Sequence, residues 1–163
     1  MAFFVLSFSM VGSACYAEVP PSAKGPSSVP AQGSTLAVVK AAATGQWSDG
    51  WYQGAAGYEK AIQEYKQTQK PVAVYINVGW CPYCRRFEKN VLSSPAVKNF
   101  MKDKIKVSLN PEAGPRENEI VSQYRIRGFP SFFLHSPQSV QAMQLNTGVS
   151  PEEFIQLFEK AQK

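Results

Sequence analysis

Cysteine and histidine are scarce in this chain, which has three Cys and one His among 163 residues. A structural zinc site needs four ligands, most often Cys and His. The close pair Cys81 and Cys84 would need two more, and His135 is the single histidine. The sequence therefore indicates no metal and no other cofactor, and metal handling by the pair is a disfavoured alternative.

Charge of either sign is not concentrated anywhere. The 17 Lys and Arg and 12 Asp and Glu give a net charge of +5, spread along the chain. No arginine-rich arm or basic helix is present, so we expect no nucleic-acid partner. The 44% hydrophobic fraction is typical of a globular protein, and the length suits one domain with a tail.

Long hydrophobic runs are also missing. Residues 1–14 are apolar or small, but a membrane-spanning helix needs about 20 such residues. We predict a signal peptide over residues 1–17, although it lacks the usual basic start. Cleavage after Ala17 would remove Cys15 and leave one cysteine pair. We expect a periplasmic or otherwise exported protein; an uncleaved anchor and a lipoprotein acylated at Cys15 are the alternatives.

The mature chain divides into two parts. Residues 18–45 are rich in Pro, Ser, Ala and Gly and predict a flexible linker, because they offer little apolar surface to bury. Residues 46–163 predict a folded domain.

Hydrophobic periodicity predicts alternating elements in that domain. The expected helices cover residues 58–70, 81–92, a segment from 94 to 101, a segment around 120–124, and 150–161. The expected strands cover 72–78, 105–109, 130–134 and 141–146, and an extra first strand is conceivable within 47–52. This order predicts an α/β protein with a central mixed sheet and helices on both faces.

Cys81 and Cys84 follow a buried strand and open a helix. Unpaired N–H groups at a helix N-terminus stabilise a thiolate. We expect Cys81, at the start of the helix, to be the exposed nucleophile and the more buried Cys84 to resolve the mixed disulfide. A purely structural disulfide is the alternative, but so small a loop yields little entropic benefit. Pro82 suits the first helical turn, and Trp80 and Tyr83 offer apolar surface beside the thiol.

Phe129 and Pro130 lie immediately before a predicted strand. If their peptide bond is cis, the loop can approach the cysteines, and Phe129 would offer backbone groups to an extended substrate chain. An ordinary turn proline is the alternative interpretation.

These motifs together resemble the thioredoxin superfamily over residues 47–163. The resemblance rests on Trp80-Cys81-Pro82-Tyr83-Cys84 after an apolar strand, on Gly128-Phe129-Pro130, and on Gly148 before the last helix. Residues 58–92 are most similar to periplasmic proteins akin to the C-terminal domain of DsbD. The resemblance implies a thioredoxin fold, Cys81 as nucleophile, Cys84 as resolving thiol and Pro130 as a cis-proline that receives substrate.

One position departs from the family pattern. Many members carry an acid six residues before the first cysteine, where it helps to move the proton of the buried cysteine. Here that residue is Tyr75, and no carboxylate lies between Val72 and Trp80. We interpret Tyr75 as a packing residue, and proton transfer would need water, another acid such as Glu88, or a slower route.

The sequence thus predicts a thiol–disulfide oxidoreductase acting on exported proteins with thiols or disulfides, or on a membrane redox partner. Reduction is slightly favoured over oxidation. The alternative is a polypeptide-binding module with thioredoxin fold whose cysteine pair is not catalytic.

Overall fold

Residues 46–163 are the part of the chain that the computed structural model describes. The predicted signal peptide (1–17) and linker (18–45) lie outside the described residues, so both remain predictions.

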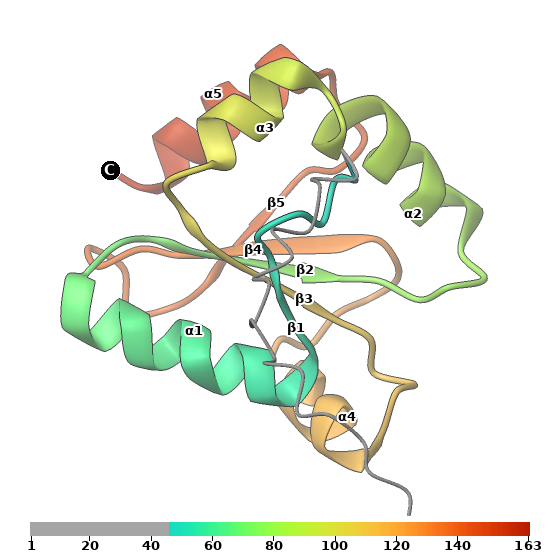
Figure 1. The fold of residues 1–163 in the computed structure, drawn as a ribbon, viewed down its shortest axis with the longest axis vertical. Helices are drawn as coiled ribbons and strands as arrows, with labels where there is room; N and C mark the ends of the chain where they lie inside the picture. The colour runs from blue at the N-terminus through green and yellow to red at the C-terminus, as the bar shows by residue number, and fades with distance from the viewer. Residues whose placement is uncertain (1–45) are drawn as a thin grey trace, which may run out of the picture. The chain divides into compact units, whose positions relative to one another are not determined.

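The described residues form one five-stranded sheet with helices on both faces (Figure 1). The strands lie in the order β1-β3-β2-β4-β5. Strands β1 and β2 pair parallel with β3, whereas β4 pairs antiparallel with both β2 and β5. The elements are β1 (Tyr52–Gln53), α1 (Gly54–Thr68), β2 (Val72–Ile76), α2 (Pro82–Phe87), η1 (Glu88–Leu92), α3 (Pro95–Met101), β3 (Ile105–Leu109), α4 (Pro115–Ser122), β4 (Ser131–His135), β5 (Met143–Leu145) and α5 (Pro151–Ala161).

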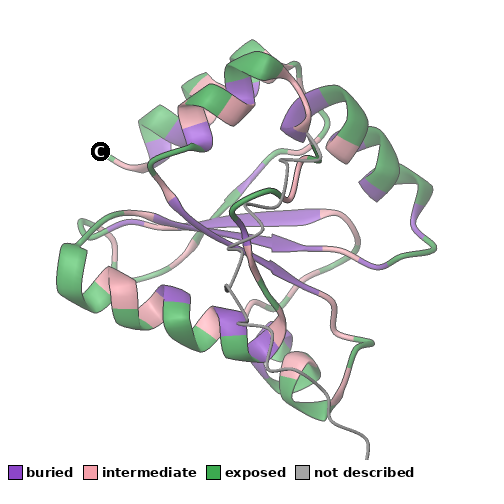
Figure 2. Cartoon of the chain, viewed as in Figure 1, coloured by how far each residue is buried: buried purple, intermediate pink, exposed green. Residues whose placement is uncertain are grey.

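The central strand β2 separates two hydrophobic clusters. Val72, Val74 and Ile76 belong to the cluster that includes residues of α1 and α4, and Ala73 and Tyr75 to the cluster that includes residues of α2, α3 and α5. Figure 2 shows the central strands buried between the two helical layers. A strand covered on both faces needs apolar residues at every position, which explains the continuous apolar run. The predicted α/β architecture with a mixed sheet is confirmed.

Several elements differ in extent from the prediction; helix α1, for example, begins at Gly54 and not at residue 58. The first strand is only two residues long, with Tyr52 opposite Val107 at the sheet edge. Helix α4 begins at Pro115, a residue suited to a first helical position, whereas the apolar pattern revealed only its end. The helix predicted through residue 92 is α-helical to Phe87 and continues as the π-helical segment η1.

Candidate active site

The cysteine pair lies where the chain leaves β2 and enters α2. Cys81 is the N-cap of α2, with extended backbone, and its Sγ accepts a hydrogen bond from the Cys84 backbone N–H at 3.2 Å. Pro82 takes the first helical position, where a missing N–H leaves no partner unsatisfied. The helix therefore directs one of its unpaired N–H groups at the Cys81 sulfur.

A distant loop completes this arrangement. The Phe129–Pro130 peptide bond is cis, and the Cys81 thiol lies 3.6 Å from the carbonyl oxygen of Phe129, to which it donates a hydrogen bond. The Phe129 side chain packs against the small cluster of Val78, Cys81 and Cys84. The two segments that the sequence singled out thus meet, although 48 positions separate Cys81 from Phe129.

The burial of Cys81 differs from expectation, whereas Cys84 is the more buried thiol, as expected. Cys81 is 3% exposed and Cys84 is 1% exposed, so the expected exposure of Cys81 is wrong. Packing of the Phe129 loop over the helix start accounts for this, because Phe129 contacts the cluster that holds both cysteines. Sequence spacing places Cys81 at the helix end but cannot reveal a covering loop.

The flanking aromatic side chains are exposed and held in place. Trp80 is 64% exposed, its indole N–H donates to both carboxylate oxygens of Glu112 at 3.0 and 3.1 Å, and its ring meets Phe129 edge-on. Tyr83 is 63% exposed, and the Arg86 guanidinium lies 5.7 Å from its ring centre. The loop that carries Trp80 is further tied down where the Arg85 side chain donates to the Gly79 carbonyl at 2.8 Å. No local motif pointed to Glu112, because it follows β3 and reaches Trp80 only through the fold.

Phe129 lines two separate hollows. One, of about 530 Å³, includes Tyr83, Arg86, Phe129, Pro130 and the segment from Thr147 to Val149 in its lining. The other, of about 400 Å³, includes Glu112, Ile126 and Phe129. Pro82 is exposed at the helix start but lines neither hollow.

Cys84 has polar neighbours on the sheet side. Burial, followed by hydrogen bonding to Cys81, raises the pKa of the Cys84 thiol, and a hydrogen bond with the Tyr75 side chain lowers it by a smaller amount. The Tyr75 hydroxyl in turn donates to Glu88 Oε1 at 2.9 Å. Tyr75 is fully buried among aromatic rings, as a packing residue should be, but its hydroxyl also joins Cys84 to Glu88.

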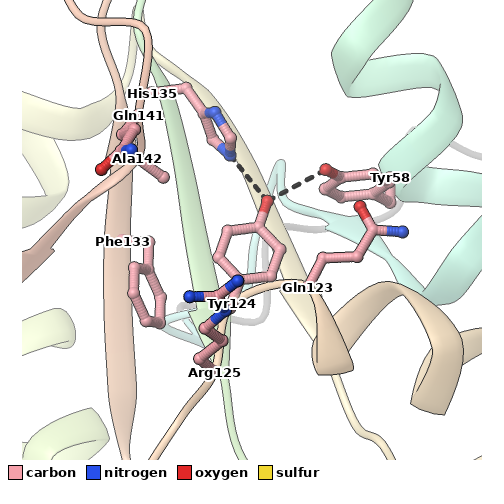
Figure 3. Close-up of a pocket in the computed structure, with 8 residues that line it drawn as sticks. All are labelled: Tyr58, Gln123, Tyr124, Arg125, Phe133, His135, Gln141 and Ala142. Atoms are coloured by element: carbon pink, nitrogen blue, oxygen red, sulfur yellow. Dashed lines mark hydrogen bonds between the residues drawn. The ribbon is translucent and has the colours of Figure 1, made fainter.

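The single histidine lies in a different pocket, of about 430 Å³ (Figure 3). The Tyr124 hydroxyl lies 3.0 Å from the hydroxyl of Tyr58 and 2.6 Å from His135 Nε2. Burial lowers the pKa of His135, which favours the neutral ring. Tyr58 and Tyr124 pack against the cluster on the α1 and α4 face, whereas Tyr75 belongs to the opposite cluster, so these groups do not join the cysteine site.

Within residues 46–163, no helix is long and apolar enough to cross a membrane. In the same range, no three or more His, Cys, Asp or Glu side chains are grouped as metal ligands would be.

A five-stranded α/β fold with a Cys-x-x-Cys pair at a helix start, facing a cis-proline loop, defines a protein of the thioredoxin fold. The family model of the thioredoxin-like domain matches residues 58–162, more than half of the chain, and the chain therefore belongs to this family. No curated protein matches the sequence.

Solved structures share the same fold. A thioredoxin from Thermus thermophilus is 24% identical, with a TM-score of 0.56, covering 68% of this chain and 84% of its own. The C-terminal domain of DsbD from Neisseria meningitidis has a TM-score of 0.57 in both redox forms. Its oxidised form is 22% identical and covers 66% of this chain and 94% of its own. Its reduced form is 20% identical and covers 66% and 98%. The predicted thioredoxin superfamily membership and fold are confirmed.

Proposed function

We propose that this protein is an exported thiol–disulfide oxidoreductase that uses Cys81 as nucleophile and Cys84 as resolving thiol. The observation that carries the proposal is the position of the Cys81 sulfur between a helix N–H and the Phe129 carbonyl. The N–H group stabilises a thiolate, and the Phe129–Pro130 loop offers backbone partners to a substrate chain beside it.

The reaction proceeds through a mixed disulfide. The Cys81 thiolate attacks one sulfur of a substrate disulfide and displaces the other sulfur as a thiolate. Cys84, as a thiolate, then attacks Cys81 Sγ, which forms the Cys81–Cys84 disulfide and releases the second substrate sulfur. Two electrons pass from the protein dithiol to the substrate, and the released thiolates take protons from solvent. Oxidation of a substrate dithiol runs the same steps in reverse.

Reduction is the slightly favoured direction. The helix N-terminus favours the dithiol form by stabilising a thiolate, and this pushes the pair toward oxidising character. The sequence pattern of residues 58–92, similar to that of the C-terminal domain of DsbD, favours reduction. Substrates are expected among exported proteins with thiols or disulfides, and a membrane redox partner would restore the dithiol. Trp80, Pro82, Tyr83, Phe129 and Pro130 are the proposed contacts for these proteins.

The test is a redox titration of the protein from residue 18 onward, followed by exchange assays. A midpoint potential near about −270 mV supports a reductant, and one near about −120 mV supports an oxidant. Cys81→Ser should abolish exchange, whereas Cys84→Ser should trap mixed disulfides through Cys81. A wild-type pair that does not exchange with glutathione or dithiothreitol rules out the redox function.

A polypeptide-binding module is the second candidate. The exposed rings of Trp80 and Tyr83 and the hollow beside Tyr83 and Pro130 favour it, because they offer apolar surface to an extended chain. Binding of a cysteine-free unfolded polypeptide, measured by fluorescence anisotropy, distinguishes the two functions. A binding module retains its affinity and its protection against aggregation in Cys81→Ser/Cys84→Ser, with no redox turnover in the wild type.

Export rests on residues 1–17 alone. Mass spectrometry of the protein expressed in a Gram-negative host and recovered from the periplasm tests it. A mature chain that begins at Glu18 supports cleavage after Ala17, and a lipid-modified chain that begins at Cys15 supports the lipoprotein alternative.

A further inference from the structure

Position 75, where many members of the family carry a buried acid, is here a tyrosine whose hydroxyl is hydrogen-bonded to a carboxylate. Tyr75 is fully buried in β2, and its hydroxyl donates a 2.9 Å hydrogen bond to Glu88 Oε1. Glu88 is only half-buried, at the start of η1. A hydroxyl inside the core is thus connected to a proton acceptor that water can reach.

Cys84 and Glu88 lie four residues apart on one continuous helical segment, so both can face the same residue of the sheet below. The Tyr75 hydroxyl and the Cys84 thiol also interact, because each shifts the pKa of the other. The Tyr75 ring packs against the aromatic side chains of Trp47, Trp51, Phe87 and Phe132. Within residues 46–163, Glu88 and Cys84 are the titratable groups that raise the pKa of the Tyr75 hydroxyl.

We infer that Tyr75 is a proton-relay residue, which passes the proton of the Cys84 thiol to the Glu88 carboxylate when the mixed disulfide is resolved. The inference rests on the proposed function, because it describes the second step of that reaction.

The transfer balances without a phenolate intermediate. The S–H bond of Cys84 breaks as its proton moves to the Tyr75 oxygen, while the O–H proton of Tyr75 moves to Glu88 Oε1. Tyr75 ends as it began, Glu88 becomes a neutral acid, and Cys84 becomes a thiolate. The thiolate attacks Cys81 Sγ, and the electron pair of the breaking mixed disulfide leaves on the substrate sulfur. Glu88 then returns its proton to solvent or to the departing thiolate.

The electrostatics support a relay rather than a base at Tyr75. Burial, with smaller contributions from the charge of Glu88 and from Cys84, raises the pKa of the Tyr75 hydroxyl well above its ordinary range. The phenol therefore stays protonated and cannot act as the final acceptor. Burial also raises the pKa of Cys84, so this thiol does not ionise readily without a base.

The experiment separates the two sulfur-transfer steps. Reduced protein is mixed in a stopped-flow instrument with dithiobis(nitrobenzoate), which releases one coloured thiolate when Cys81 attacks and a second when Cys84 resolves the mixed disulfide. Cys84→Ser assigns the phases, because it should give the first release only. Tyr75→Phe and Glu88→Gln are the test variants, and Tyr124→Phe is the matched control. Tyr124 is a partly buried tyrosine whose hydroxyl is hydrogen-bonded on the other face of the sheet (Figure 3).

In Tyr75→Phe and in Glu88→Gln, the first release should keep its wild-type rate while the second slows by about 10²-fold, within the range for general acid–base catalysis. The double variant should be no slower than either single one, since the two residues act in one path. The second release should depend weakly on pH near neutrality in the wild type. In the variants its rate should rise about tenfold per pH unit, because hydroxide must then take the proton.

A second release in Tyr75→Phe that matches wild type and Tyr124→Phe in rate and pH profile overturns the relay but leaves the proposed function intact. Equal slowing of both releases also overturns it, because that outcome indicates a structural role. If wild-type protein gives no second release, Cys84 does not resolve, and the proposed function fails together with the relay. Should Tyr75→Phe not fold, the comparison of Glu88→Gln with wild type decides by the same criteria.

Discussion

Because the Cys84 thiol is buried, we predict that it makes the free energy of unfolding fall as the pH rises into the alkaline range. Cys84 is 1% exposed, and desolvation is the largest cause that raises its pKa above the ordinary value of 9.0. At alkaline pH the folded chain keeps a proton that the unfolded chain releases. The stabilisation is complete below about pH 9 and is lost as the pH rises toward the folded pKa. Each pH unit in that window lowers the free energy of unfolding by about 1.4 kcal/mol.

A pair of variants isolates this effect. Cys81→Ser keeps the Cys84 thiol but cannot form the internal disulfide. Cys81→Ser/Cys84→Ser differs from it only by loss of the Cys84 thiol. Urea unfolding of both is measured from about pH 7 to about pH 11 under reducing conditions. Subtracting the two curves cancels shared groups that do not interact with Cys84, including Tyr124, whose pKa is also raised by burial. The difference should be constant to about pH 9 and then fall by about 1.4 kcal/mol per pH unit.

A difference that stays constant to about pH 11 would refute the reasoning, since it would mean that Cys84 ionises alike in the folded and unfolded chains. An independent measurement is the ultraviolet absorbance of the thiolate in Cys81→Ser. In folded protein this absorbance should develop at higher pH than in urea-unfolded protein.

Three further predictions concern packing, capping and the site. Phe132→Ala should lower the free energy of unfolding by about 3–5 kcal/mol, because this fully buried ring lies at the centre of the larger aromatic cluster; urea unfolding measures it, and a loss below about 1 kcal/mol would contradict it. Ser150→Ala should lower the free energy of unfolding by about 1 kcal/mol in the same assay, because the Ser150 hydroxyl accepts a hydrogen bond from the Glu153 N–H at 3.2 Å. Its rate of disulfide exchange should stay unchanged. Glu112→Ala should raise KM for a polypeptide disulfide by up to about fivefold through loss of the hydrogen bonds to Trp80, with dithiothreitol exchange unaffected; an unchanged KM would show that Trp80 needs no such support.

Much of the fold was predictable because its signals are local. The continuous apolar run of β2 predicts a buried strand, and Ser150 predicts the start of α5; each signal lies within a few residues. The two-residue strand β1 is different, since it exists only through pairing with β3 and carries no period of its own. The change from α2 to η1 is likewise invisible, because Glu88–Leu92 has no composition that sets it apart from an α-helical turn.

The same distinction holds at the site. The cysteine pair and the Phe129–Pro130 segment were each identifiable from neighbouring residues, and the structure brings them together. The burial of Cys81, the support of Trp80 by Glu112 and the bond between Tyr75 and Glu88 were not predictable. Each depends on contacts between segments whose relative placement is set by sheet register and helix packing.

Strand and helix periods together explain why position 75 has access to the resolving thiol. In β2, side chains alternate between the two faces, so Ala73 and Tyr75 share the cluster that contains Cys84's neighbour Phe87, while Val74 belongs to the other cluster. On the helix above, residues four apart lie on one face, which brings Cys84 and Glu88 over the same part of the sheet. A short carboxylate at position 75 would itself have to be a buried acid. A tyrosine at this position buries only a neutral hydroxyl. Its side chain is long enough for that hydroxyl to reach the carboxylate of Glu88, which is only half-buried. The chain thus retains a route for the proton and avoids a buried carboxylate. Burying a charged group in a protein core costs more free energy than burying a hydrogen-bonded hydroxyl.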